Sequence, residues 1–123
     1  MAGQNLKGPA RIVAAFFNSC KGYRATWIHE EAFRQEVYLL AAGGPLGLWL
    51  GNGGIEKVLL VGSILLVLIV ELLNTGIEIV VDRISFERHE LSGRAKDVGS
   101  AAVLTALLLA AATWGFILLP RWL

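Results

Sequence analysis

Residues 58–82 read VLLVGSILLVLIVELLNTGIEIVVD, an apolar helical pattern that carries polar side chains at regular intervals. Glu71, Asn74, Glu78 and Asp82 are spaced by three, four and four residues, so they lie on one helix face. A carboxylate at membrane depth costs roughly 2.5 to 3.5 kcal/mol on insertion scales, so it usually faces a cavity, a partner or a chemical task. We therefore expect the functional site on this face.

The rest of the chain is typical of an all-α membrane protein. Of its 123 residues 55% are hydrophobic, and residues 98–119 carry no charge, which is long enough to cross a ~30 Å hydrocarbon layer at ~1.5 Å per residue. We predict one membrane domain with three transmembrane helices at about 32–51, about 55–82 and about 97–120, and a cytoplasmic loop at 83–96. Two clusters, Gly43-Gly44-Pro45 and Gly51-Asn52-Gly53-Gly54, predict an irregular first span that turns at the second cluster.

An amphipathic surface helix is predicted at about 9–30, where apolar residues recur at helical spacing and Gly8-Pro9 fits the start. The simpler interpretation of this helix is a membrane anchor, and the more specific one is a lid at the lipid boundary. The single Cys20 falls in this helix on the predicted cytoplasmic side, so we expect no internal disulfide. A signal peptide is not expected, because the apolar run at 12–17 is too short for one.

The distribution of basic residues predicts the orientation. Lys and Arg are frequent before the first span and between the second and third, whereas only Lys57 and Arg121 mark the opposite side. The positive-inside rule therefore places the N-terminus and the 83–96 loop in the cytoplasm. The net charge of +1 does not indicate a basic surface that would bind nucleic acid.

Depth along the second span separates the two glutamates. If Lys57 reaches the outer interface, Glu71 lies ~21 Å further in, within the hydrocarbon layer, and Glu78 lies ~10 Å beyond it, at the cytoplasmic interface. A deep, desolvated carboxylate suits a general base acting on a weakly acidic hydroxyl, and a wetter one suits a hard cation. The alternative is a polar seam that joins helices through hydrogen bonds, with Asn74 and Thr75 contributing.

The segment 85–97 is dense in charges of both signs. It is either a solvated loop or a site for a metal-bound polyphosphate, in which carboxylates hold the cation and basic groups meet the oxygens. Glu30 could complete a cation site with Glu78, or simply be part of a charged helix shoulder. Neither a P-loop nor a protein-kinase motif set is present, so phosphoryl transfer would need another scaffold.

Four stretches resemble the prokaryotic diacylglycerol kinase family: ELLNTGIEIVVD at 71–82, HELSGRAKDVGSAAV at 89–103, WIHE at 27–30 and AFRQE at 32–36. The resemblance implies a homotrimer in the bacterial inner membrane, with active sites composed from neighbouring subunits. Each site would move the γ-phosphoryl group of Mg·ATP onto diacylglycerol and give phosphatidic acid.

The resemblance also implies roles for individual residues. Glu71 would be the general base, with Asn74 in support, and Glu30 and Glu78 would hold Mg²⁺. The positions that match ATP contacts are Arg11, Glu30, Glu78, Glu87, Arg88, His89, Lys96 and Asp97. The positions that match the lipid site are Arg24, Trp27, Ala32, Phe33, Arg34, Gln35, Glu36, Trp49, Lys57, Glu71 and Ser100. Gly76 stands where the family usually has alanine.

Two alternative functions stay open at this point. Undecaprenol kinase is a relative with the same scaffold, and acceptor choice depends on a lipid pocket that the sequence specifies weakly. A small proton-coupled transporter would use an intramembrane glutamate as a proton relay. Against transport stand the charged residues gathered at one interface and the absence of a buried charge in the third span.

Overall fold

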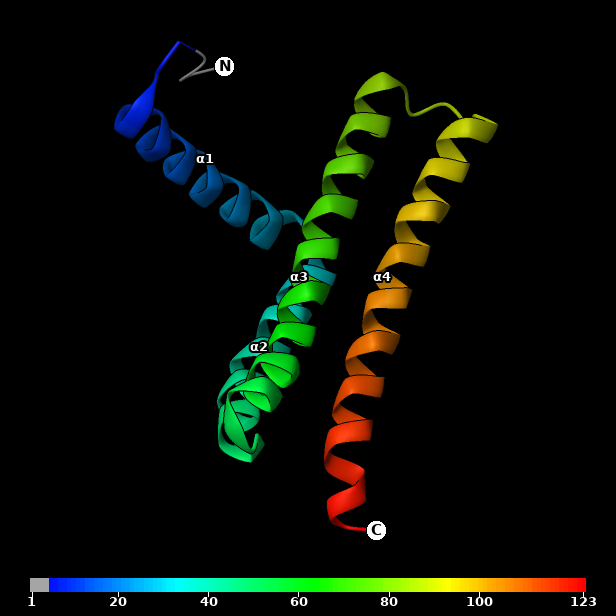
Figure 1. Ribbon diagram of the computed structural model, residues 1–123. Coiled ribbons are helices and arrows are strands. Elements are labelled where there is room, and N and C mark those ends of the chain that lie inside the picture. The colour runs from blue at the N-terminus through cyan, green and yellow to red at the C-terminus, as the bar shows by residue number, and fades with distance from the viewer. Residues whose placement is uncertain (1–4) are drawn as a thin grey trace. The chain divides into compact units, whose positions relative to one another are not determined.

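The computed structural model describes residues 5–123, and every regular element in that range is helical (Figure 1). The elements are α1 (Gly8–His29), α2 (Glu31–Leu50), α3 (Gly53–Ile84), α4 (Glu90–Leu118) and a short 3-10 helix, η1 (Leu119–Arg121). The predicted all-α class is thus confirmed. The chain forms two compact units, one ending at Glu31 and the other running from Ala32 to Leu123.

The first unit is built on α1, which covers the predicted surface helix. Gly8 adopts φ +62° and Pro9 occupies the first turn, where its missing N–H costs no helical bond. The helix ends at His29, and the N–H of Glu30 still donates to Thr26 O at 2.9 Å. Ile12, Val13 and other large hydrophobic side chains of α1 are exposed, as expected of a helix that lies on a membrane.

The α2 helix runs without a break through Gly43-Gly44-Pro45, so the irregularity predicted there is wrong. The glycines serve close packing against α3 rather than a break in the helix. A Cβ at Gly43 would come within 2.5 Å of Ile64 Cδ1, and one at Gly47 would come within 3.2 Å of Leu60 Cβ, so these glycines let α2 approach α3 closely. Pro45 is exposed, and membrane helices tolerate the hydrogen bond that proline removes.

The turn predicted at the second glycine cluster is confirmed. Gly51 and Asn52 separate α2 from α3, and Gly53 begins α3 with φ +83°, a conformation that side chains disfavour. Arg121, near the C-terminus, binds the residues on both sides of this turn. Its Nη1 donates to Leu50 O at 2.7 Å, and its Nη2 pairs with Glu56.

The helices α3 and α4 form an antiparallel pair joined by residues 85–89 (Figure 1). The predicted loop at 83–96 is therefore too long, because α4 begins at Glu90 rather than near residue 97. His89 Nδ1 accepts the Leu91 N–H at 3.0 Å and caps the helix, and Arg94 pairs with Glu90 at 3.1 Å across its first turn. A stretch that reads as a charged loop is thus the start of a helix.

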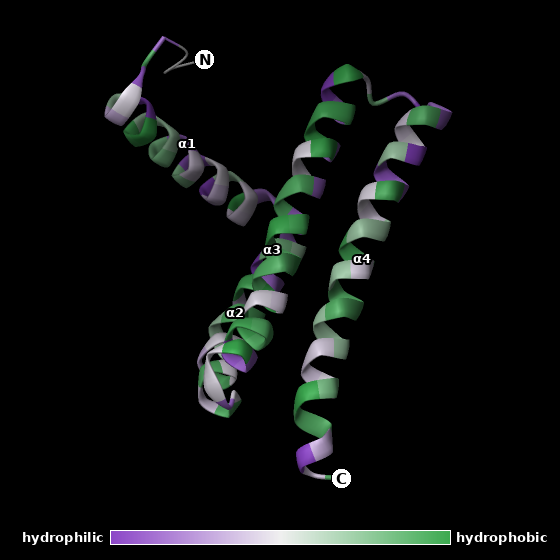
Figure 2. Cartoon of the chain, viewed as in Figure 1, coloured by the Kyte–Doolittle hydropathy of each residue, from purple (hydrophilic) through white to green (hydrophobic). Residues whose placement is uncertain are grey.

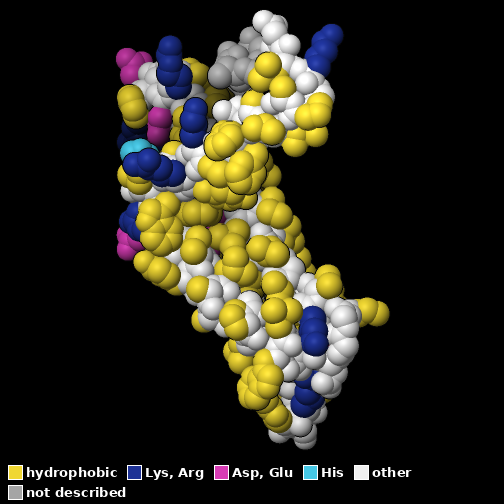
Figure 3. Space-filling view, turned by 90° about the vertical axis from the view of Figure 1, so that its left-hand side faces the viewer, with side chains coloured by type: hydrophobic (Ala, Val, Ile, Leu, Met, Phe, Trp, Pro, Cys, Tyr) yellow, Lys and Arg dark blue, Asp and Glu magenta, His cyan; other side chains and the backbone are white. Residues whose placement is uncertain are grey.

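The core of the second unit lies between α3 and α4. Val67 packs with Ala106 and Ala110, and Trp114 Nε1 donates to Leu60 O at 2.9 Å. Figure 2 shows that both helices are apolar along most of their length. Large hydrophobic side chains cover much of the face seen in Figure 3.

Two helical stretches, Gly53–Ile84 and Glu90–Arg121, are long and apolar enough to cross a membrane, judged by length and composition. Membrane spans are therefore supported for the second and third predicted segments. The first predicted span, which corresponds to α2, remains a prediction.

Candidate functional site

The polar residues of α3 occupy one face, as predicted, and this face is turned toward α4. The side chain of Asn74 lies against the backbone of Gly99 on α4. The Asp82 carboxylate accepts a hydrogen bond from Lys96 Nζ, also on α4, at 2.7 Å. Exposure increases along the face: the Glu71 side chain is buried at 5% exposure, whereas Glu78 and Asp82 are half-buried. The face thus offers a dry carboxyl group at one end and wetter ones at the other.

A second carboxyl group accompanies Glu71. Glu36 of α2 is 8% exposed and lies close enough for its charge to interact with that of Glu71. Its Oε2 atom has no hydrogen-bond partner among residues 5–123. The family resemblance implied a lipid-site position for Glu36. No sequence pattern indicated its interaction with Glu71, because the two residues belong to different helices.

Asn74 links the buried and the half-buried parts of this face. Its Nδ2 atom donates to Glu78 Oε1 at 3.2 Å, while its Oδ1 atom is directed at Gly99 of α4. Within the described chain neither Asn74 Oδ1 nor Thr75 Oγ1 has a hydrogen-bond partner. A polar seam would satisfy these atoms across the helix interface, so the seam alone does not explain this arrangement.

The charged ends of α3 and α4 enclose a depression of about 220 Å³. Four of the predicted ATP-contacting residues line it, together with Asp82: Glu87, Arg88, His89 and Lys96. His89 Nδ1 is already engaged by the Leu91 N–H, so only the other ring nitrogen can meet a ligand. The depression combines basic and acidic groups, as a metal-bound polyphosphate requires.

Other predicted residues are not gathered there. Asp97 does not line the depression, and Arg11, Arg24, Trp27 and Glu30 belong to the first compact unit. Glu30 is half-buried just beyond the end of α1. Its predicted pairing with Glu78 in one cation site stays a prediction.

Glu78 suits a magnesium ligand in some respects. Asn74 occupies only one of its oxygens, and the half-buried carboxylate is reached by water. No group of three His, Cys, Asp or Glu side chains able to hold a metal occurs within residues 5–123. Mg²⁺ usually binds one or two carboxylates and completes its shell with water and phosphate oxygens, so the second oxygen of Glu78 is a donor of the kind that Mg²⁺ binds.

Apart from Arg24 and Trp27, the predicted lipid-site residues spread along the second unit. Phe33 and Glu36 are buried near the start of α2, whereas Trp49 is 80% exposed near its end. Lys57 is half-buried and stands fourteen residues before Glu71 on α3, about 21 Å along the helix. The others are exposed except for half-buried Arg34: Ala32, Gln35 and Ser100.

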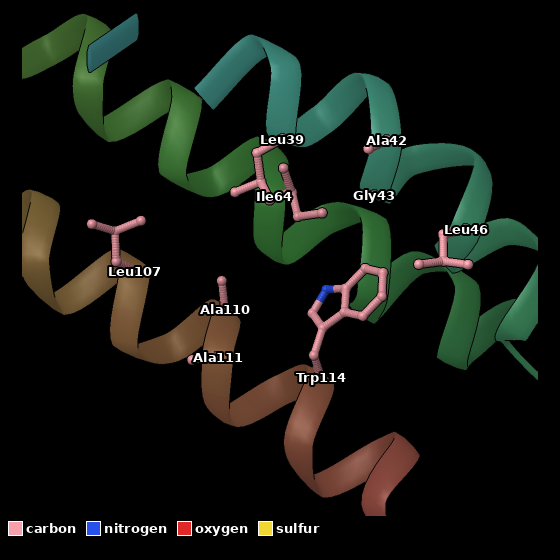
Figure 4. Close-up of a pocket in the computed structure, with 9 residues that line it drawn as sticks. All are labelled: Leu39, Ala42, Gly43, Leu46, Ile64, Leu107, Ala110, Ala111 and Trp114. Carbon is pink, nitrogen blue, oxygen red and sulfur yellow. The ribbon is translucent and has the colours of Figure 1, made fainter. Parts of the chain in front are cut away.

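An apolar cavity of about 380 Å³ opens between α2, α3 and α4 (Figure 4). The ring of Trp114 reaches across it from α4, and Gly43 and Ile64 line it from α2 and α3. Ile64 precedes Glu71 by seven residues, so both lie on one face of α3 about 10 Å apart along the axis. The sequence patterns did not predict this cavity, although the small residues at 42–44 and 110–111 could have indicated it.

Sequence comparisons identify the family of this chain. The family profile described as prokaryotic diacylglycerol kinase matches residues 17–118. Proteins named diacylglycerol kinase from Escherichia coli K12 and Haemophilus influenzae are 53% identical over 114 residues and 50% identical over 111 residues. The matches cover 93% of both chains in the first case, and 90% of this chain and 94% of the relative in the second. The Pseudomonas aeruginosa protein of that name is 46% identical over 112 residues, 91% of each chain. The chain belongs to the prokaryotic diacylglycerol kinase family.

Proposed function

We propose that this kinase transfers the γ-phosphoryl group of Mg·ATP to the hydroxyl of diacylglycerol and yields phosphatidic acid and ADP. Family membership supports a kinase acting on diacylglycerol. The observation that carries the chemistry is the gradient along α3, from buried Glu71 to half-buried Glu78 and on to the Asp82–Lys96 pair. A catalyst for this reaction needs that gradient, because the lipid arrives from the bilayer and the nucleotide from water.

The proposed reaction proceeds in one displacement. Glu71 removes the proton from the lipid hydroxyl while the hydroxyl oxygen attacks the γ-phosphorus, and the bond to the β-phosphate oxygen breaks to release ADP. Asn74 orients the Glu78 side chain next to the base, through the hydrogen bond from Asn74 Nδ2 to Glu78 Oε1. Phosphoryl transfer depends mainly on alignment and neutralisation of charge, which helices can supply without a P-loop.

The nucleotide is proposed to occupy the depression between α3 and α4. Lys96 and Arg88, which line it, would meet phosphate oxygens there. Glu78 and Glu30, which lie outside its lining, would hold Mg²⁺, as the family resemblance implies. When bound, the ion neutralises phosphate charge. Glu78 stands about 10 Å along α3 from Glu71, so the γ-phosphate must reach inward past Asn74 to meet the lipid hydroxyl.

The apolar cavity is proposed to take part of an acyl chain. It lies on the same face of α3 as Glu71, on the side away from the charged end. A lipid whose hydroxyl meets Glu71 would run its tail in this direction, along apolar side chains. Burial of each methylene stabilises the complex by about 0.8 kcal/mol.

The assembly and its membrane placement are part of the proposal. The resemblance to the family supports a homotrimer with shared active sites, a third span on α2 and a location in the inner membrane. The asymmetry of Lys and Arg supports an N-terminus and active site that face the cytoplasm.

The decisive experiment measures transfer of radiolabel from ATP to diacylglycerol in mixed micelles by wild type and Glu71→Gln. Loss of the base is expected to lower turnover by about 10²- to 10⁴-fold, while circular dichroism and elution volume stay unchanged. Glu90→Gln is the matched control, because Glu90 is exposed and only pairs with Arg94. Full phosphorylation by Glu71→Gln would remove the base assignment, and a parallel assay with undecaprenol tests the acceptor.

A further inference from the structure

We infer that Gly99 of α4 is a positioning residue, whose bare Cα seats the Asn74 amide so that Asn74 holds the Glu78 carboxylate in place. The inference rests on the proposed metal role of Glu78. It adds to the site a residue that carries no functional group and that no spacing argument on α3 could reveal.

The side chain of Asn74 lies directly against the backbone of α4 at Gly99. An added Cβ at Gly99 would overlap Asn74 Oδ1, and its next neighbours would be Asn74 Cγ at 3.1 Å and Asn74 Cβ at 3.9 Å. The three nearest atoms therefore all belong to Asn74. Both residues are buried, so neither can move aside into solvent.

The two ends of the Asn74 amide have different tasks. Oδ1 stands over the Gly99 Cα, where a Cα–H group can act as a weak donor to an oxygen that has no conventional partner within residues 5–123. With Oδ1 seated there, Nδ2 points along α3 and donates to Glu78 Oε1 at 3.2 Å. One carboxylate oxygen is thereby fixed and the other is left for a cation, as second-layer hydrogen bonds do for metal ligands.

Glycine is the residue that this contact requires. A methyl group at position 99 must push the amide away from α4 or separate the two helices, and either change disturbs the bond from Nδ2 to Glu78. Gly76 of α3 provides the contrast, because a Cβ there meets no atom within 4 Å. Helix propensity alone favours alanine over glycine by about 1 kcal/mol at both positions, so an adverse effect confined to position 99 must come from its contact.

The first experiment measures Mn²⁺ affinity by electron paramagnetic resonance, using protein in detergent micelles with a non-hydrolysable ATP analogue. Gly99→Ala is expected to weaken Mn²⁺ binding by about 10- to 100-fold, and Gly76→Ala, the matched control, should leave it unchanged. Wild-type affinity in Gly99→Ala would overturn the inference.

A double-mutant cycle then asks whether Gly99 acts through Asn74. Once Asn74 is alanine, the nearest of these atoms to the new methyl group is the Cβ at 3.9 Å, an ordinary contact. Asn74→Ala/Gly99→Ala should therefore bind Mn²⁺ as Asn74→Ala does, whereas a further loss equal to that of Gly99→Ala alone would overturn the inference. If Gly99→Ala fails to fold, recovery of folding in the double variant supports the contact, and failure of both variants contradicts it.

Glu78→Gln separates this inference from the function on which it rests. If Glu78→Gln binds Mn²⁺ as wild type does, the proposed metal role of Glu78 is wrong. If Glu78→Gln weakens binding and Gly99→Ala does not, the metal role stands and the positioning role of Gly99 is wrong.

Discussion

At the scale of single residues, the acidic side chains of α3 differ in their access to water. Glu71 is buried between helices, whereas the Glu78 carboxylate is half-buried and accepts one hydrogen bond from Asn74. A buried carboxylate gains basicity toward a nearby hydroxyl, and one that water reaches can exchange its solvent for a cation. We therefore propose different tasks for these two glutamates from their different burial along one helix.

Glu78→Gln tests the second task. The amide keeps the shape and one acceptor oxygen but loses the charge, so we expect a higher apparent Mg²⁺ requirement and lower turnover. Phosphorylation rates are measured against Mg²⁺ concentration at fixed ATP, with Glu90→Gln as the control. An unchanged Mg²⁺ dependence would assign Glu78 a purely structural role.

Residue positions within α3 could be predicted from sequence, and their neighbours on other helices could not. The spacing of Glu71, Asn74 and Glu78 fixes a shared face because one helix has one period. That Glu36 lies beside Glu71, and Gly99 beside Asn74, depends on how far α2 and α4 slide along α3. Side-chain packing sets that register, and no pattern within one segment reports it.

At the scale of elements, Trp114 fastens α4 to α3 through its ring nitrogen. Trp114→Phe keeps most of the ring but loses the bond to Leu60 O, so it should lower the free energy of unfolding by about 1 kcal/mol. Denaturation in micelles followed by circular dichroism measures the change. Trp122→Phe is the control, because Trp122 is 72% exposed at the chain end, and an equal effect of both variants would contradict this role.

The cavity beneath the Trp114 ring allows a test of the acyl-chain proposal. Ala111→Phe adds a ring to the cavity lining, so it should raise the KM for diacylglycerol several-fold and leave the KM for ATP unchanged. Ala112→Phe, at the next position of α4 and outside this lining, is the control. An unaltered lipid KM in Ala111→Phe would mean that the tail lies elsewhere.

Helix boundaries show where local signals mislead. Gly43-Gly44-Pro45 reads as a break, yet buried glycines are what close contact with α3 requires, and the helix continues. The charged stretch after residue 89 reads as a loop, yet the His89 cap and the Glu90–Arg94 pair begin α4 there. The uncharged run at 98–119, by contrast, predicted the later part of α4, and the apolar helical pattern at 58–82 predicted most of α3 in spite of its acidic residues.

At the scale of the whole molecule, the start of α4 bears on the proposal of shared active sites. Lys96, which pairs with Asp82, lines the α3–α4 depression, whereas the next residue, Asp97, does not. Asp97 is therefore expected to serve a site completed by another subunit.

Mixed assemblies test this division. We expect Glu71→Gln and Asp97→Asn each to have little activity alone and to regain part of it when co-expressed, because some sites then contain neither substitution. Glu71→Gln with Glu78→Gln is the control. Both residues lie on the same α3, so every site in that mixture is damaged, and activity should stay at the level of the separate variants. Failure of the first pair to recover activity would contradict sharing of Asp97 between subunits.

The brevity of the link at Gly51 and Asn52 bears on how the chain enters the bilayer during synthesis. The α2 helix carries Arg34 and Glu36, so on its own it is a poor candidate for insertion by the translocon, whereas α3 is strongly apolar. If α2 spans the membrane as proposed, so short a link requires α2 and α3 to be inserted together as a helical hairpin. The nascent α2, with its buried acid, would then be drawn to depth by the helix that follows it.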